Sequence, residues 1–265
     1  MDLRLAGKVA LVTGASKGTG LAVTRALVGE GVSVVAAARS LTDGLSRLST
    51  QGRVHPVPVD LGTPDGPARL NDEAVVAYGG LDVLINNVGA LRPRTAGFLS
   101  LSDDDWLWGL TINFLAAIRT TRAALTHLLE RGAGTIVSTC SANAVLPDPL
   151  VIDYSAAKAA LLNFSKSLSK EVGPQGVRVN TASPGPVATP LWLGDDDVTA
   201  VTATVGRAGD VEAGDVAKQA ASETVTGRFI RPEEVADLIV LLASDRAGNV
   251  TGSDFVIDGG LITTL

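Results

Sequence analysis

The chain has 265 residues, of which 46% are hydrophobic and 19% are charged, and it contains 29 glycines. This balance predicts a folded, turn-rich globular protein and excludes a disordered chain. The 22 basic and 28 acidic residues give a net charge of −6. An acidic balance disfavours a broad nucleic-acid or anionic-membrane surface, although a local basic pocket stays possible.

The predicted location is the cytoplasm. No apolar run approaches the ~18 residues that span a bilayer, and the N-terminus leads into a predicted strand without a cleavable signal. Cys140 is the only cysteine, so no intrachain disulfide is expected. His55 and His127 lie far apart, and we expect no metal site. Of the two acidic triplets, 103–105 is expected to open a helix and 195–197 to be a solvated loop.

Short apolar runs alternate with longer segments of helical spacing. The runs lie at 8–14, 33–38, 53–60, 81–87, 134–140, 177–183 and 253–260. Helical segments are expected from Gly20, Trp106, Tyr154 and Pro232, among others. Nearly all-apolar strands alternating with helices indicate a parallel sheet covered on both faces. The prediction is one α/β domain over 1–265, a Rossmann-like doubly wound sheet of about seven mainly parallel strands with its ligand site at their carboxyl ends.

Residues 190–231 fit this alternation poorly. They contain several glycines and no clear strand, which predicts one or two short helices in a long excursion. Long excursions often serve as lids or binding loops, so a substrate lid is expected here. An ordinary surface insertion is the alternative.

The turn after the first strand reads "TGASKGTG" and contains Gly14, Gly18 and Gly20. It lies between a strand and a helix, where glycines let the backbone approach a pyrophosphate at a helix N-terminus. The second strand ends in Ala38 followed by Arg39, with no acid to hold ribose hydroxyls. A guanidinium there, with Lys17 in the glycine turn, suits a 2′-phosphate. The pattern favours NADP(H) over NAD(H); alternatively, both basic residues are ordinary solvated ones.

The segment "DYSAAK" places Tyr154 and Lys158 four residues apart, and therefore on one face of a helix. Taken alone, the pair also fits a packing tyrosine and a solvated lysine. Further motifs surround it in order: "NNVG" at 86–89, Asn113 in "TINFLAA", Ser141 thirteen residues before Tyr154, and "SPGPVATP" at 183–190. With the glycine turn and a "VD" ending at Asp60, the ordered set resembles the short-chain dehydrogenase/reductase family over nearly the whole length.

This resemblance implies a site residue by residue. Asn113, Ser141, Tyr154 and Lys158 would form the catalytic tetrad, with Tyr154 as general acid or base. The expected cofactor-binding residues are Gly14, Ser16, Lys17, Gly18, Gly20, Arg39, Asp60, Leu61, Asn87, Gly89, Tyr154, Lys158, Pro184, Gly185, Val187 and Thr189. A homotetramer or dimer is also implied, built on the long helices after Trp106 and from Tyr154.

The roles make chemical sense. Moving the pKa of a phenol from ~10 to ~7 takes roughly 4 kcal/mol, which one cation at ~4 Å supplies at an effective dielectric of ~20. Lys158 is the expected cation, and it would also bind the nicotinamide ribose. Ser141 would hydrogen-bond the substrate oxygen, and Asn113 would help to carry protons through water. Alternatively, Asn113 satisfies a helix kink and Ser141 ends a strand.

Two departures from the family pattern are mild. Val88 replaces the usual alanine, and Cys140 occupies a place often held by serine. Cys140 is expected to be a small buried residue without a lowered thiol pKa.

The predicted function is NADP(H)-dependent reduction of a carbonyl or oxidation of a secondary alcohol. The substrate would lie between Ser141, Tyr154, residues 142–153, residues 91–99 and the excursion after Pro190. Leu146, Leu150, Leu191, Trp192 and Leu193 favour a small hydrophobic or extended substrate over a free sugar. The alternatives are a dinucleotide-binding regulator without turnover, and an isomerase, epimerase or dehydratase that retains its cofactor.

Overall fold

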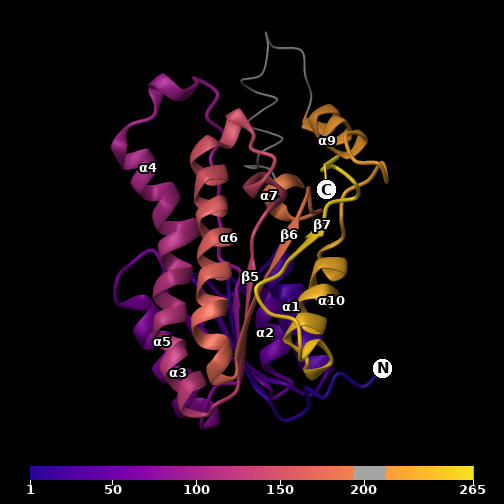
Figure 1. Cartoon of the computed structure of the whole chain (residues 1–265). Coiled ribbons are helices and arrows are strands. Elements are labelled where there is room, and N and C mark those ends of the chain that lie inside the picture. The colour runs from indigo at the N-terminus through magenta and orange to yellow at the C-terminus, as the bar shows by residue number, and fades with distance from the viewer. Residues whose placement is uncertain (194–212, 265) are drawn as a thin grey trace.

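The structure is a computed structural model that describes residues 1–193 and 213–264 (Figure 1). The acidic triplet at 195–197 and the middle of the predicted lid at 190–231 lie outside the described residues. Side chains of Leu191 and of residues 213–216 are likewise not described.

Seven parallel strands form one sheet in the order β3-β2-β1-β4-β5-β6-β7. The predicted Rossmann-like doubly wound fold is therefore confirmed. The strand order reverses between β1 and β4, so the switch point lies where these two strands end. The strands are β1 (Val9–Thr13), β2 (Ser33–Ala38), β3 (Val54–Pro58), β4 (Val83–Asn86), β5 (Gly134–Thr139), β6 (Val177–Pro184) and β7 (Asp254–Ile257).

Helices cover both faces of the sheet (Figure 1). One face is covered by α1 (Gly18–Gly29), α2 (Asp43–Ser49) and α10 (Pro232–Ala243). The other carries α3 (Gly66–Tyr78), α5 (Ala116–Glu130) and α6 (Ile152–Val172), with α4 (Asp103–Leu110) beside α6. Two further helices, α7 (Pro190–Leu193) and α9 (Ala213–Ser222), lie near the carboxyl ends of the strands.

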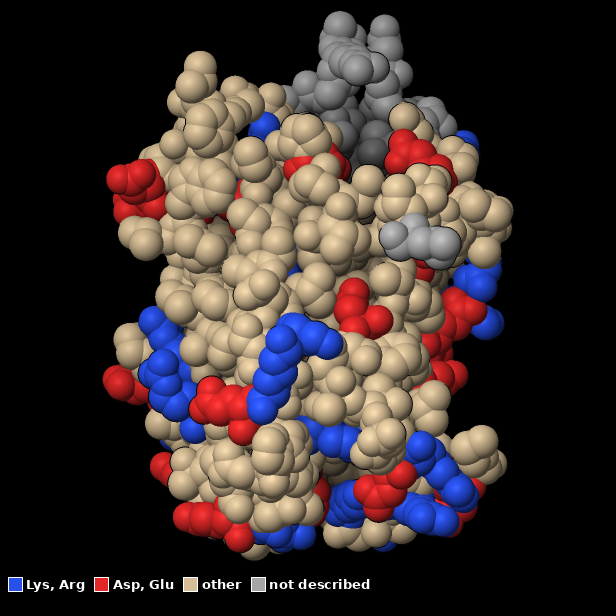
Figure 2. Space-filling view, in the orientation of Figure 1, with Lys and Arg blue, Asp and Glu red and all other residues tan. Residues whose placement is uncertain are grey.

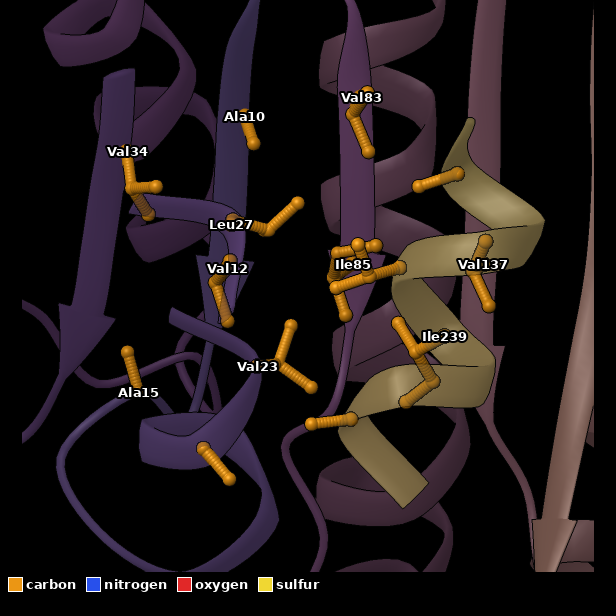
Figure 3. Packing of buried hydrophobic residues seen from close by; sticks show 14 of the residues in the cluster. Ala10, Val12, Ala15, Val23, Leu27, Val34, Val83, Ile85, Val137 and Ile239 are labelled. Carbon is orange, nitrogen blue, oxygen red and sulfur yellow. The ribbon is translucent and has the colours of Figure 1, made fainter. Parts of the chain in front are cut away.

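Alternate strand residues enter two separate cores. Val12, Val34 and Ile85 pack with Val23 and Ile239 from α1 and α10 (Figure 3). Their strand neighbours point the other way, into a second cluster that includes Leu11, Val35, Leu84, Leu128 and Leu168. Because successive strand side chains point to opposite faces, a sheet buried on both sides needs unbroken apolar strands. This explains why the strands were recognisable in the sequence.

The helix expected from Trp106 begins earlier and changes pitch. Ser102 and Asp105 form a capping box, and Asp103, Asp104 and Asp105 lie in the first turn, where acids favour the helix dipole. After α4 the chain makes a π-helical turn at Thr111–Leu115 before continuing as α5. Predicting a single helix missed this turn, which contains Asn113.

Charged side chains are unevenly distributed on the face drawn in Figure 2. Lys and Arg gather in the lower half, among several Asp and Glu, and the area just above the centre of this face is largely neutral. Among the described residues, no helix has the length and apolar content needed to cross a membrane.

Replacing Ile239 by alanine should destabilise the fold strongly. Ile239 is fully buried between α10 and the sheet, and such a truncation leaves a cavity that costs about 2–5 kcal/mol of unfolding free energy. Leu241 on the same helix is 41% exposed, so Leu241→Ala is the matched control and should cost less than about 1 kcal/mol. Urea unfolding followed by circular dichroism measures both. Equal losses would contradict this packing.

Candidate active site

A cleft of about 1900 Å³ opens along the carboxyl ends of the strands. Its volume exceeds the ~300–1,000 Å³ typical of a small-ligand pocket and leaves room for a dinucleotide beside a substrate. Most of the predicted site residues line it: Gly14, Ser16, Lys17, Gly18, Arg39, Asp60, Leu61, Asn87, Gly89, Ser141, Tyr154, Lys158, Pro184, Gly185, Val187 and Thr189. Gly20 and Asn113 do not line it and instead lie buried behind its wall.

In the glycine turn the start of α1 packs tightly against the backbone that leaves β1. Gly14 and Gly18 have φ of 67° and 53°, a region that L side chains rarely adopt. A Cβ on Gly20 would collide with the carbonyl of Gly14. Asn87 supports the turn from β4, since its Nδ2 donates to Thr13 O at 3.1 Å and to Gly14 O at 3.4 Å.

Two cations lie at the adenosine end of the expected site. Lys17 and Arg39 are both exposed, and neither forms an ion pair with any residue in the described ranges. Thr42 Oγ1 donates to Ser16 O at 2.6 Å, which holds the chain after β2 against the glycine turn. Asp60 Oδ1 accepts the Gly62 N–H at 2.9 Å. The end of β2 therefore offers positive charge and no acid.

Tyr154 and Lys158 lie in the first two turns of α6, facing the end of β5. Lys158 is 2% exposed, and its Nζ donates to Thr139 O at 2.8 Å. The same nitrogen lies 5.6 Å from the centroid of the Tyr154 ring. Ser141 follows β5 and lies close enough to the Tyr154 hydroxyl to lower its pKa. The Ser141 Oγ accepts the Asn143 N–H at 3.2 Å and donates to Asn143 Oδ1 at 3.4 Å. Ser141, Tyr154 and Lys158 thus meet at one point in the cleft.

The protein groups around Tyr154 favour the neutral phenol. Burial raises the pKa of Tyr154 to about 12, and the nearby Ser141 side chain opposes the rise only in part. Burial also lowers the pKa of Lys158. The expectation that Lys158 brings the phenol pKa to ~7 is therefore not met by these groups, because desolvation disfavours both charged forms.

Asn113 uses its side chain to hold the backbone. Its Nδ2 donates to Ala90 O at 2.7 Å and to Gly109 O at 3.0 Å, and its Oδ1 accepts the Ala90 N–H at 3.0 Å. These bonds connect the π-helical turn to the segment after β4, at the residue that follows Gly89. The side chain therefore does what the alternative sequence interpretation proposed, and a proton-carrying role for Asn113 stays a prediction.

The chain after β6 closes the cleft on its far side. A Cβ on Gly18 would lie 3.1 Å from Thr189 Cγ2, so Thr189 lies against the glycine turn. Val187 bridges to Ile230, and the Gly185 N–H donates to Ile257 O at 3.0 Å. Trp192 also lines the cleft and packs edge-on against Phe229 at 5.7 Å.

A buried ion pair absent from the sequence interpretation lies next to Tyr154. Arg94 donates from Nε to Asp153 Oδ1 at 3.2 Å and from Nη2 to Asp153 Oδ2 at 2.6 Å. Its Nη1 donates to Asp105 Oδ1 at 2.8 Å. The Asp153 side chain is 1% exposed, and hydrogen bonding to it raises the pKa of Arg94. The pair ties the segment after β4 to the residue that precedes Tyr154.

Two further observations concern the single cysteine and possible metal ligands. Cys140 is buried, with Sγ 3.1 Å from Lys158 O, and burial raises the pKa of its thiol. Within the described part of the chain no three His, Cys, Asp or Glu residues gather as a metal site would require.

Comparison with known proteins places these motifs among oxidoreductases. The family model described as short chain dehydrogenase matches residues 8–197. The chain is 33% identical to a 3-alpha-(or 20-beta)-hydroxysteroid dehydrogenase of Mycobacterium tuberculosis, over 100% of this chain and 93% of that protein. It is 31% identical to a 3-oxoacyl-[acyl-carrier-protein] reductase of Thermotoga maritima, over 98% and 100%.

A solved structure extends the likeness to three dimensions. L-sorbose reductase from Gluconobacter frateurii, complexed with NADPH and L-sorbose, superposes with a TM-score of 0.89. The two chains are 34% identical, and each is covered over 100% of its length.

The pKa of Tyr154 can be tested directly, because the chain has only two tyrosines. In a Tyr78→Phe variant, the phenolate absorbance reports Tyr154 alone and should titrate with a midpoint near 12, above the ordinary value of ~10. Unfolding free energy should also fall as pH rises from about 10 to about 12, since the unfolded chain releases the proton first. Adding Tyr154→Phe to this variant should reduce this fall, and the remainder is expected from Cys140, whose thiol pKa is also raised by burial. A midpoint at or below ~10 would contradict the burial effect.

Proposed function

The chain belongs to the short chain dehydrogenase family of oxidoreductases, and we propose that it interconverts a carbonyl compound and a secondary alcohol with NADP(H). The observation that carries this proposal is the meeting of Ser141, Tyr154 and Lys158 in the cleft beside a glycine turn. Each residue type suits one step of carbonyl reduction.

The residues present fit a nicotinamide dinucleotide. The glycine turn, with Gly20 packed against Gly14, gives a pyrophosphate access to the backbone. Asp60, Leu61, Asn87 and Gly89 would contact the adenosine and central parts, and Pro184–Thr189 the nicotinamide end. When bound, NADPH supplies the hydride for the carbonyl carbon.

In this proposal the protein handles the proton and the developing charge. Tyr154, neutral at physiological pH, donates its proton to the carbonyl oxygen. Ser141 orients that oxygen by a hydrogen bond. Lys158, held by Thr139 O next to the Tyr154 ring, stabilises the phenolate that forms.

The preference for NADP(H) is supported by Lys17 and Arg39, which are unpaired in the described ranges and lie on the cleft. A fixed guanidinium binds a 2′-phosphate well, whereas the acid that usually holds ribose hydroxyls is missing after β2. The similar L-sorbose reductase was solved with NADPH.

The proposed substrate is a small organic molecule with a largely apolar body. Leu146 and Leu150 line the cleft and are 45% and 39% exposed, and Trp192 lies nearby on α7. Leu193 does not contribute, since it is 52% exposed and lies off the cleft. A sugar is the competing class, because the similar structure holds L-sorbose. Cytoplasmic location and a tetramer or dimer built on α4, α5 and α6 also belong to this proposal.

Tyr154→Phe should reduce carbonyl reduction by about 10²–10⁴-fold, the usual contribution of a positioned general acid. The assay follows NADPH consumption over a panel of apolar ketones, aldehydes and sugars. Tyr78→Phe on α3 is the control and should keep wild-type activity. Full activity in Tyr154→Phe would remove this residue from the acid role, and a preference confined to sugars would contradict the apolar substrate class.

The same assay separates the two rival functions. A dinucleotide-binding regulator would bind NADPH, as followed by tryptophan fluorescence, without turning over any member of the panel. An isomerase, epimerase or dehydratase would form product with no net consumption of cofactor.

Arg39→Ala should weaken the binding of NADPH without affecting the binding of NADH. Losing a charge-assisted hydrogen bond to the 2′-phosphate costs about 1.5–3 kcal/mol, which raises the KM for NADPH by roughly tenfold to a hundredfold. The KM for NADH should stay unchanged, because NADH carries no phosphate there. A similar rise in KM for both cofactors would show that Arg39 does not bind the 2′-phosphate.

A further inference from the structure

The cleft carries a cation, Arg92, that has no ionic partner among the described residues. Arg92 follows β4, is exposed and lines the cleft. Its Cζ lies 3.9 Å from the centroid of the Trp108 ring on α4. It forms no hydrogen bond or ion pair with any residue in 1–193 or 213–264.

Arg94, two residues further on, shows what a structural arginine looks like in this segment. Its side chain is 10% exposed and makes three hydrogen bonds to the carboxylates of Asp153 and Asp105. Within the described ranges Arg92 has no carboxylate partner, although two acidic residues, Asp148 and Glu223, also line the cleft. The Asp148 carboxylate accepts the Leu150 N–H at 2.9 Å instead. The charge of Arg94 is therefore paired with two carboxylates of the fold, whereas the guanidinium of Arg92 faces the cleft.

The path of the chain places Arg92 close to the reacting groups. The segment begins at Gly89, where a Cβ would lie 3.4 Å from Lys158 Nζ. It ends at Arg94, whose N–H donates to Leu150 O at 2.6 Å and whose side chain binds Asp153, the neighbour of Tyr154. Arg92 lies between these two fixed points, and its Cα can be no more than about 11 Å from that of Gly89.

Stacking prepares this guanidinium for a planar anion. An arginine over a tryptophan face gains a cation–π interaction and loses rotamer freedom before any ligand binds. Its N–H groups point outward in the plane of the guanidinium, in the fork that matches a carboxylate. The exposed leucines 146 and 150 meanwhile give the same cleft apolar surface.

We propose that Arg92 is the anion-binding end of the substrate site, and that the substrate is a keto acid or hydroxy acid. Its carboxylate binds Arg92, its apolar chain lies along the cleft, and its carbonyl meets Ser141 and Tyr154. This inference rests on the proposed function and names its substrate class. It predicts an amphiphilic substrate, in contrast both to a wholly apolar ketone and to a neutral sugar.

The test compares keto acids of several chain lengths with their methyl esters, which share the carbon skeleton and lack the charge. Wild-type enzyme should show a higher kcat/KM for the acid at one chain length. Arg92→Met should lower kcat/KM for that acid by about tenfold to a hundredfold, mainly through KM. The ester should change by less than about twofold, since it makes no charge-assisted bond to Arg92. Arg92→Lys should keep part of the preference, because it retains the charge without the fork.

A binding measurement separates this inference from the proposed function. The probes are saturated fatty acids of the same chain lengths, each titrated by calorimetry into the NADPH-bound wild type and into NADPH-bound Arg92→Met. Weaker binding to the variant supports the carboxylate site even when no substrate turns over. Equal binding to both proteins, equal loss of acid and ester activity in Arg92→Met, or a wild-type preference for esters would overturn it. Absence of turnover for every acid and ester, with binding intact, would instead contradict the proposed function.

Discussion

All seven strands end at one edge of the sheet, and helices cover both of its faces. Apolar side chains fill those faces. The polar groups of the cleft lie along the carboxyl ends of the strands, and short hydrogen bonds between strand ends set the geometry there. Thr13 Oγ1, at the end of β1, accepts the N–H groups of Asn87 and Val88 after β4, at 2.8 and 3.1 Å. Asn87 Oδ1 in turn accepts from Thr139 at the end of β5, and the Thr139 carbonyl holds Lys158. The position of the lysine therefore follows from the register of three parallel strands.

This dependence explains which features could be predicted from the sequence. Unbroken apolar strands and the glycine turn are local patterns, and each carries its own physical reason in the sequence. The spacing of Tyr154 and Lys158 correctly predicts one helix face. The π-helical turn at Thr111–Leu115 has no such local pattern, and it is the turn that directs Asn113 toward Ala90 and Gly109. Residue types indicate that a side chain can hydrogen-bond, whereas only the fold decides to what.

The Arg94–Asp153 pair is a second feature that local sequence patterns do not predict, here because the partners lie far apart in the sequence. The two residues are 59 positions apart, and although Asp153 opens the "DYSAAK" segment, nothing in that segment indicates Arg94 as its partner. In the fold they connect the segment after β4 with the first turn of α6 and leave no space beside them, because a Cβ on Gly109 would lie 2.7 Å from Asp153 Oδ2. An unpaired charge at a site as buried as Asp153 would be costly, so the two segments are held together. Tyr154, one residue from Asp153, is thereby fixed relative to the wall that carries Arg92.

The acidity of Tyr154 is a property of this whole environment rather than of the Tyr–Lys pair. A cation lowers the pKa of a phenol only to the extent that its attraction for the phenolate exceeds the cost of removing that charge from water. Here burial disfavours the charged forms of Tyr154 and Lys158 alike, and the ammonium is directed at a backbone carbonyl. The protein groups alone therefore keep the phenol protonated at neutral pH, the form that can donate a proton to a carbonyl oxygen. In the proposed reaction the phenolate forms on the path in either direction, so its stabilisation would need a further positive charge close to the ring.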